Sequence, residues 1–177
     1  MANIIRDECG SAAVCLPGGF QARRSYARLS ISRVDMTATP EPFGVDLNVP
    51  GETELPDGRR IVISEHGGRP EQWPEASSME GVFDAAAVGT CLRARSLRGG
   101  DRMAVLGMRG TKKISDLLVD EKVPVDERAG LVCITDCTDT ILWLPGLRMS
   151  RDAAITQSTT SYYRVRLTRH GRGTDGS

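Results

Sequence analysis

The sequence predicts an α+β fold, in which a small β-rich N-terminal unit precedes a mixed sheet with one main helix. Three observations predict it. Short runs that alternate apolar and polar residues recur along the chain, as in strands with one buried face. Only one segment, at 111–123, carries the apolar spacing of an amphipathic helix. The stretch from Ser64 to Gly81 is polar, contains a Gly-Gly pair and two prolines, and has no period, so we expect a domain boundary there.

The predicted N-terminal unit, residues 1–75, consists of short strands joined by turns. Residues 16–20 form a Pro-Gly-Gly turn, and residues 36–44, which hold two prolines, form a linker. Asp57-Gly58 favours a tight turn between the two strands of a hairpin. The strands expected in this unit are 26–31, 45–50, 52–55 and 60–63.

The second predicted unit, residues 82–169, is a sheet that carries the helix. Polar residues between two apolar runs near residues 135–139 indicate a hairpin. The glycine-rich tail at 170–177 is predicted to be disordered. The strands expected in this unit are 82–85, 91–96, 131–134, 140–144 and 162–167.

The helix prediction depends on one apolar stripe. Ile114, Leu117 and Leu118 lie at the i, i+3 and i+4 positions, and Pro124 ends the pattern. Two residues can cap its start, Thr111 or Ser115. The stripe is expected to pack against four strand residues, Val132, Ile134, Ile141 and Trp143.

Composition and charge exclude several classes of protein. The formal net charge of +0 excludes a globally basic nucleic-acid binder, but the two halves differ. Residues 1–90 hold 8 basic and 13 acidic side chains, and residues 91–177 hold 15 basic and 10 acidic ones. Only the second half has the charge bias of a polyanion-binding surface. No apolar run is long enough for a membrane span or a signal peptide, so we expect a cytoplasmic protein without membrane contact.

Cysteine and tryptophan residues favour structural roles. Five cysteines, an odd number without framework spacing, predict buried and inert thiols, and Cys133-x3-Cys137 with two histidines elsewhere is no zinc motif. Trp73 is expected to pin its loop to a neighbouring surface, with base stacking as the less favoured alternative.

A basic run in the second unit is the strongest candidate for function. Seven basic residues and one acid lie within a predicted strand, a glycine-rich loop and a helix start. Glycines allow close backbone approach to a ligand, and free amides at a helix start attract anions. We expect these side chains to form one surface that contacts the phosphates of a polyanion: Arg93, Arg95, Arg98, Arg102, Arg109, Lys112 and Lys113.

The alternative interpretation of the basic run is a solvated surface without a ligand. Lys112 and Lys113 argue against it, because the sequence places them in the first helical turn, where the helix dipole disfavours cations by roughly 0.3 to 1 kcal/mol each. A bound anion would offset that cost. Asp101 and Asp116 are expected to be a turn residue and a helix-surface residue rather than a catalytic pair.

Several segments, in order and spacing, resemble the C-terminal domain of tRNA(Ile)-lysidine synthetases. The resemblance extends from about Val82 to Leu167, and a weaker one precedes it near residues 16–26 and 49–52. Its motifs are Arg95-Ser-Leu-Arg-Gly-Gly-Asp-Arg102, Leu106-Gly-Met-Arg-Gly-Thr-Lys-Lys-Ile-Ser-Asp116, Asp120-Glu-Lys-Val-Pro124 and Ile141-Leu-Trp-Leu-Pro-Gly-Leu-Arg148.

The resemblance implies a part of an ATP-dependent ligase that joins lysine to the wobble cytidine of tRNA(Ile). The family's C-terminal domain has an α+β fold, shared with part of a tRNA synthetase β subunit, and helps to hold the tRNA. The family's ATP, Mg and lysine bind at an N-terminal PP-loop domain with a Ser-Gly-Gly-x-Asp-Ser pattern, which this sequence lacks.

We therefore expect a tRNA-binding C-terminal portion that is inactive alone, with no catalytic residue, no metal and no cofactor of its own. Its expected partners are tRNA(Ile) and a PP-loop catalytic chain, if the catalytic domain is supplied separately. The alternative function is a protein-interaction module, whose basic surface pairs with carboxylates of a separate catalytic subunit.

Overall fold

The computed structural model describes residues 12–16, 20–25, 28–33, 41–75 and 77–169. The chain divides into two compact units, one within residues 1–39 and one from residue 40 onward. The predicted boundary at 64–81 is therefore wrong, because the strands on both sides of it belong to the second unit. The predicted disordered tail at 170–177 lies outside the described residues.

The first unit contains a three-stranded antiparallel sheet. Its strands follow one another in the sheet in chain order, so each pairs with its sequence neighbour. The predicted strand at 26–31 overlaps the third of them from residue 28. The strands are β1 (Ala12–Leu16), β2 (Phe20–Ser25) and β3 (Arg28–Arg33).

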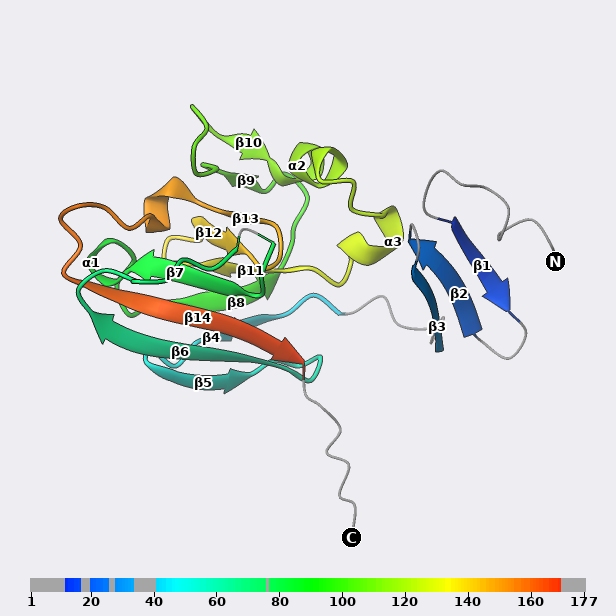
Figure 1. Cartoon of the computed structure of the whole chain (residues 1–177), viewed down its shortest axis with the longest axis horizontal. Coiled ribbons are helices and arrows are strands. Elements are labelled where there is room, and N and C mark those ends of the chain that lie inside the picture. The colour runs from blue at the N-terminus through cyan, green and yellow to red at the C-terminus, as the bar shows by residue number, and fades with distance from the viewer. Residues whose placement is uncertain (1–11, 17–19, 26–27, 34–40, 76, 170–177) are drawn as a thin grey trace, which may run out of the picture. The chain divides into compact units, whose positions relative to one another are not determined.

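A four-stranded antiparallel sheet in the second unit has the order β5-β6-β14-β7 (Figure 1). The β5–β6 hairpin confirms the turn predicted at Asp57-Gly58, where Gly58 has a φ of 77° and the Asp57 carboxylate accepts from the Arg59 amide at 3.0 Å. The strands are β5 (Gly51–Glu54), β6 (Arg59–Gly67), β7 (Glu80–Asp84) and β14 (Ser161–Arg169).

A five-stranded sheet in the same unit has the order β13-β12-β11-β8-β4. The β11–β12 pair confirms the second predicted hairpin. Strand β4 comes from the segment assigned by sequence to the N-terminal unit, and it pairs with β8. The strands are β4 (Gly44–Asp46), β8 (Arg93–Ser96), β11 (Val132–Thr135), β12 (Ile141–Leu144) and β13 (Arg148–Met149).

The remaining elements are short. A two-stranded ribbon, β9–β10, lies beside helix α2 in Figure 1, on the opposite side of the five-stranded sheet from β6 and β14. Its strands are β9 (Arg102–Met103) and β10 (Lys112–Lys113). The helices are α1 (Ala85–Val88), α2 (Ile114–Asp120), α3 (Val125–Arg128) and the 3-10 turn η1 (Arg151–Ala153).

The main core combines side chains from both sheets, including the fully buried Ile61, Phe83, Ile134 and Val165. Its side chains are mostly aliphatic, as the low aromatic content of the sequence requires. Burial of this apolar surface is the main source of the unit's stability.

Helix α2 has the predicted apolar stripe but a different packing partner. Ile114, Leu117 and Leu118 are all buried, as predicted. They pack with residues of β9, β11 and β12 in a second cluster, which we call the α2 cluster. Of the four expected partners, only Ile141 is in this second cluster. Neighbouring strand residues point to opposite faces. In β11 the second cluster therefore takes Cys133, whereas Val132 and Ile134 belong to the main core. In β12 the second cluster takes Ile141 and Leu144, whereas Trp143 belongs to the main core.

The three cysteines whose side chains the structure describes divide between core and surface. Cys133 is buried, and burial raises the pKa of its thiol to about 12. Cys91 and Cys137 are exposed, so the prediction of buried thiols is wrong for those two. In the part of the chain that the structure describes, no helix is long and apolar enough to cross a membrane.

Candidate nucleic-acid interface

Arg95, one of the seven candidate phosphate-binding residues, is a buried structural residue. Its side chain is only 4% exposed and is held by two carboxylates. Its Nε donates to Asp139 at 2.7 Å, and both terminal nitrogens donate to Asp101, at 2.9 and 3.1 Å. Burial disfavours the guanidinium charge, but these hydrogen bonds outweigh it and raise the pKa of Arg95. The structure therefore excludes Arg95 from the predicted surface.

Asp101 has the turn role expected of it and a second role as the partner of Arg95. Its carboxylate accepts from the Arg98 backbone N–H at 2.8 Å, which closes the turn between β8 and β9. Burial alone would raise the pKa of Asp101, but the hydrogen bonds from Arg95 and Arg98 outweigh it, and the pKa lies below its usual range. Asp116, as expected, is exposed on α2.

Three other candidates are ion-paired on the surface. Arg93 pairs with Asp46 at 2.7 Å, and Arg98 pairs with Asp139 at 3.0 Å. Lys112 pairs with Asp120 at the end of α2. A phosphate that approached one of these cations would be repelled by the carboxylate beside it. These positions are weaker phosphate sites than unpaired cations.

Arg102, Arg109 and Lys113 are exposed and have no carboxylate partner among the described residues. Arg102 and Lys113 lie directly opposite each other in the β9–β10 pair, where like charges repel. The Thr111 hydroxyl and carbonyl accept from the Arg102 guanidinium at 3.3 and 3.4 Å, which orients it without neutralising its charge. We call residues 102–113, with these three cations, the basic hairpin.

The basic hairpin is anchored through its apolar residues. Met103 and Val105 are buried in the α2 cluster. Val105 forms an isolated antiparallel bridge with Ser150, and the Leu106 amide donates to the Met149 carbonyl at 2.9 Å. Gly107 and Gly110, with φ values of 81° and 75°, take left-handed conformations that suit glycine and turn the chain back. The loop that carries Arg109 is thus attached to β13.

The two lysines precede α2 instead of forming its first turn. Lys113 is the N-cap residue and makes no side-chain capping bond. Neither proposed cap is used: Thr111 accepts from Arg102, and Ser115 donates to Asp116 inside the helix. The helix dipole therefore disfavours the charge of Lys113, at the N-cap, but acts less on Lys112, which lies outside the helix. The pair of like charges in the ribbon, Arg102 and Lys113, is the clearer sign of an uncompensated positive surface.

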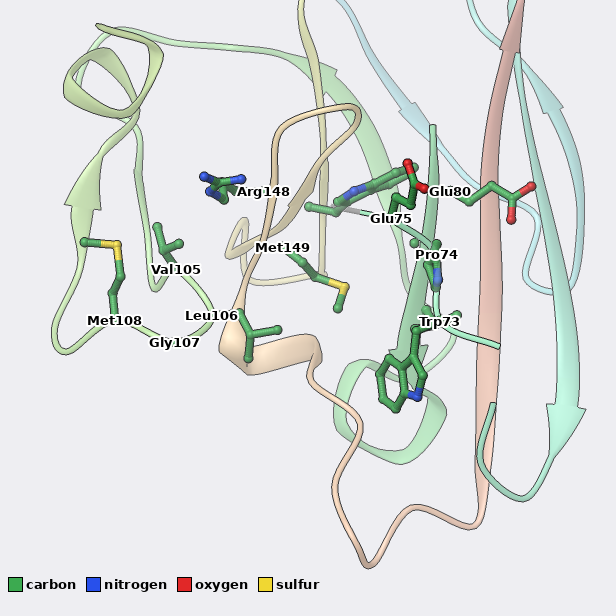
Figure 2. A pocket seen from close by; sticks show the side chains of 13 residues that line it. Trp73, Pro74, Glu75, Glu80, Val105, Leu106, Gly107, Met108, Arg148 and Met149 are labelled. Atoms are coloured by element: carbon green, nitrogen blue, oxygen red, sulfur yellow. The ribbon is translucent and has the colours of Figure 1, made fainter. Parts of the chain in front are cut away.

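A cleft of about 520 Å³ adjoins the basic hairpin (Figure 2). In Figure 2, Leu106 and Met149 face Trp73 and Pro74 across it. Trp73 is 54% exposed, so it does not pin its loop as the sequence suggested. The cleft is lined by Trp73, Pro74, Glu75, Glu80, Gly81, Val82, Val105, Leu106, Gly107, Met108, Trp143, Arg148 and Met149.

Sequence reasoning missed the cleft because its lining comes from three segments that are far apart in the chain, near residues 73–82, 105–108 and 143–149. The one available signal was a tryptophan in a polar stretch without periodicity. Among the described residues, no group of three His, Cys, Asp or Glu side chains is placed to hold a metal ion.

Fold and site together define a class: a sheet-rich α+β domain with an exposed hairpin on which three cations have no carboxylate partner among the described residues. Residues 92–167 match the family described as the TilS substrate C-terminal domain. The crystallised chain in "Crystal structure of TILS C-terminal domain" is 30% identical in sequence to this one. The match covers 74% of this chain and 99% of the crystallised chain, with a TM-score of 0.64. The chain belongs to the tRNA(Ile)-lysidine synthase C-terminal domain family, which confirms the resemblance seen in the sequence.

The curated relatives are bacterial proteins named tRNA(Ile)-lysidine synthase. The one from Geobacillus kaustophilus (strain HTA426) is 35% identical over 154 residues, which are 86% of this chain and 32% of that protein. The one from Symbiobacterium thermophilum is 32% identical over 174 residues, which are 94% of this chain and 35% of that protein. The chain thus spans about a third of the length of these relatives.

Proposed function

We propose that this domain holds tRNA for a tRNA(Ile)-lysidine synthase, through phosphate contacts made by the basic hairpin. The observation that carries the proposal is the set of three exposed cations, Arg102, Arg109 and Lys113, that no carboxylate neutralises among the described residues. Bringing phosphates to these cations releases counterions from the RNA and relieves the repulsion between Arg102 and Lys113. Arg93, Arg98 and Lys112 contribute less, because each already has a carboxylate partner.

The proposed contacts recognise the shape of a helical stem rather than its sequence. Phosphate contacts position a protein on a nucleic acid but carry no base information themselves. Double-stranded RNA is bound mainly through shape and backbone contacts. We expect cognate and non-cognate tRNAs to lose affinity together when the hairpin cations are removed.

As part of the same proposal, the whole synthetase catalyses the ligase reaction that joins lysine to tRNA(Ile). We place ATP, Mg and lysine outside this chain, because its residues do not fit them. The sequence has no PP-loop pattern, and the described residues hold no cluster of metal ligands. The tRNA substrate, a PP-loop chain as partner and the cytoplasmic location stay predictions.

The test compares two charge-matched double variants. Arg102→Gln with Lys113→Gln removes two unpaired cations of the hairpin, and Arg60→Gln with Arg69→Gln removes two cations from β6 and the loop after it. Affinity for a tRNA(Ile) transcript is measured over a salt series. The slope of log K against log salt is negative, and each lost phosphate contact reduces its magnitude by about 0.7 to 0.9. We expect the magnitude to fall by about 1.4 to 1.8 for the hairpin variant only.

Two results contradict the proposal. Equal loss in both variants would show a general charge effect without a site. Unchanged tRNA affinity in the hairpin variant, together with loss of binding to a purified catalytic chain, would support the protein-interaction module instead.

A further inference from the structure

The phosphate contacts leave the cleft beside the basic hairpin without a role. Three large apolar side chains are half exposed at its walls and mouth: Trp73 at 54%, Leu106 at 48% and Met108 at 48%. Soluble proteins seldom leave contiguous apolar surface open unless it binds something. The volume, about 520 Å³, lies within the range of about 300 to 1,000 Å³ that is typical of pockets for small ligands.

Charges around the cleft favour an anionic occupant over a basic peptide. Glu80, in the wall, is already paired with Arg164 at 3.3 Å and Arg166 at 2.6 Å. Glu75 is the other carboxylate of the lining. Two positive charges adjoin the lining. Arg109 follows the lining residue Met108, and the Arg151 guanidinium donates to the Met108 carbonyl at 3.4 Å. Neither arginine has a carboxylate partner among the described residues.

The same loop belongs to both features. Leu106 and Met108 line the cleft, and Arg109, the next residue, belongs to the unpaired cations of the basic hairpin. An RNA phosphate bound at Arg109 would therefore lie next to a residue of the cleft lining. A ligand with a flat aromatic ring joined to a phosphate matches this arrangement of an indole ring, apolar side chains and arginines.

We propose that the cleft takes one unpaired base of the bound RNA, stacked on Trp73 and packed against Leu106 and Met108, with its phosphate at Arg109. This inference rests on the proposed function and extends it from backbone contacts to the capture of a single-stranded base. Stacking on an aromatic side chain tolerates every base, because each has a π face. The cleft therefore distinguishes unpaired from paired RNA without reading sequence.

The test uses RNA duplexes with one common stem. One is blunt, and the others carry unpaired nucleotides as a 3′ overhang, a 5′ overhang or a bulge. Stacking of a base on an aromatic ring corresponds to about 5- to 150-fold in affinity. We expect one unpaired form to bind at least 5-fold more tightly than the blunt duplex, and Trp73→Ala to abolish that gain while leaving blunt-duplex affinity unchanged.

The matched control is Met79→Ala, which removes another half-exposed apolar side chain that does not line the cleft. It should keep the gain. A second measurement, tryptophan fluorescence, does not depend on comparing the affinities of variants. The chain has two tryptophans, and Trp143 is buried. Stacking on Trp73 should quench its fluorescence. Trp73→Phe should remove most of the RNA-dependent quenching, because Trp143, which also lines the cleft, is only 2% exposed.

The outcomes separate this inference from the proposed function. If no RNA binds, the proposed function fails and the inference fails with it. If all duplexes bind equally, or the gain survives Trp73→Ala, the inference alone is wrong. Dimerisation without RNA that is lost in Trp73→Ala would assign the cleft to a second copy of the chain and would overturn the inference.

Discussion

Asp101→Asn should destabilise the domain strongly, because it leaves the charge of Arg95 half compensated inside the fold. Arg95 is 4% exposed and Asp101 is 12% exposed, so little water is available to replace the lost carboxylate. Removing one partner of a buried ion pair costs about 3 to 5 kcal/mol. We expect about 3 kcal/mol, at the lower end of that range, since Asp139 still accepts from Arg95 at 2.7 Å.

The assay is urea unfolding, supported by thermal melts, with two control variants. A loss of about 3 kcal/mol corresponds to a Tm lower by about 6 to 12 °C for a domain of this size. Asp139→Asn should cost less, because the Asp139 side chain is 50% exposed. Asp116→Asn removes an exposed carboxylate from the start of α2 and should cost below about 1 kcal/mol. Equal costs for Asp101→Asn and Asp116→Asn would refute the reasoning.

The pH dependence gives a second check on Asp101. Its pKa is lower in the folded state than the value of about 3.9 for an unfolded aspartate. A lowered pKa contributes stability that is complete above the unfolded pKa and is lost as the pH falls through the folded one. The stability difference between the wild type and Asp101→Asn should therefore be full at neutral pH and narrow below about pH 4. A difference that does not change with pH would contradict this assignment.

Three further predictions concern the core, the thiols and catalysis. Leu117→Ala should cost about 2 to 5 kcal/mol in unfolding free energy, because Leu117 is buried in the α2 cluster, whereas Val119→Ala on the exposed face should cost below about 0.5 kcal/mol. In the folded protein Cys133 should resist a thiol reagent that modifies Cys91 and Cys137, as counted by mass spectrometry, and its modification at a similar rate would contradict its burial. The purified chain should form no lysidine on a tRNA(Ile) transcript with ATP and lysine, and detectable lysidine would overturn that expectation.

The sequence could predict features that depend on neighbouring residues. The Asp57-Gly58 hairpin and the apolar stripe of α2 each depend on a few residues that are close together in the sequence, and the structure contains both. The domain boundary could not be found this way. It depends on the pairing of β4 with β8 and of β6 with β14, and such long-range pairing leaves no local pattern.

The candidate site shows the same division between local and long-range information. The basic run was visible in the sequence, but nothing local distinguishes Arg95 from Arg102. Arg95 lies opposite Cys133 in the middle of a sheet, and one of its carboxylates, Asp139, lies 44 residues further along the chain. Arg102 lies on a two-stranded ribbon with one face open to solvent. Which cations are neutralised depends on tertiary structure.

The place of β14 in its sheet has a consequence for how the protein is synthesised. Of the strands that the structure describes in this unit, β14 is the last to leave the ribosome, yet it lies between β6 and β7 and pairs with both. Until it is made, β6 and β7 each keep an open edge, and the main core lacks Val165. Open edges invite pairing with other chains. A stop codon shortly before residue 161 would therefore yield an aggregation-prone chain in place of a smaller folded domain.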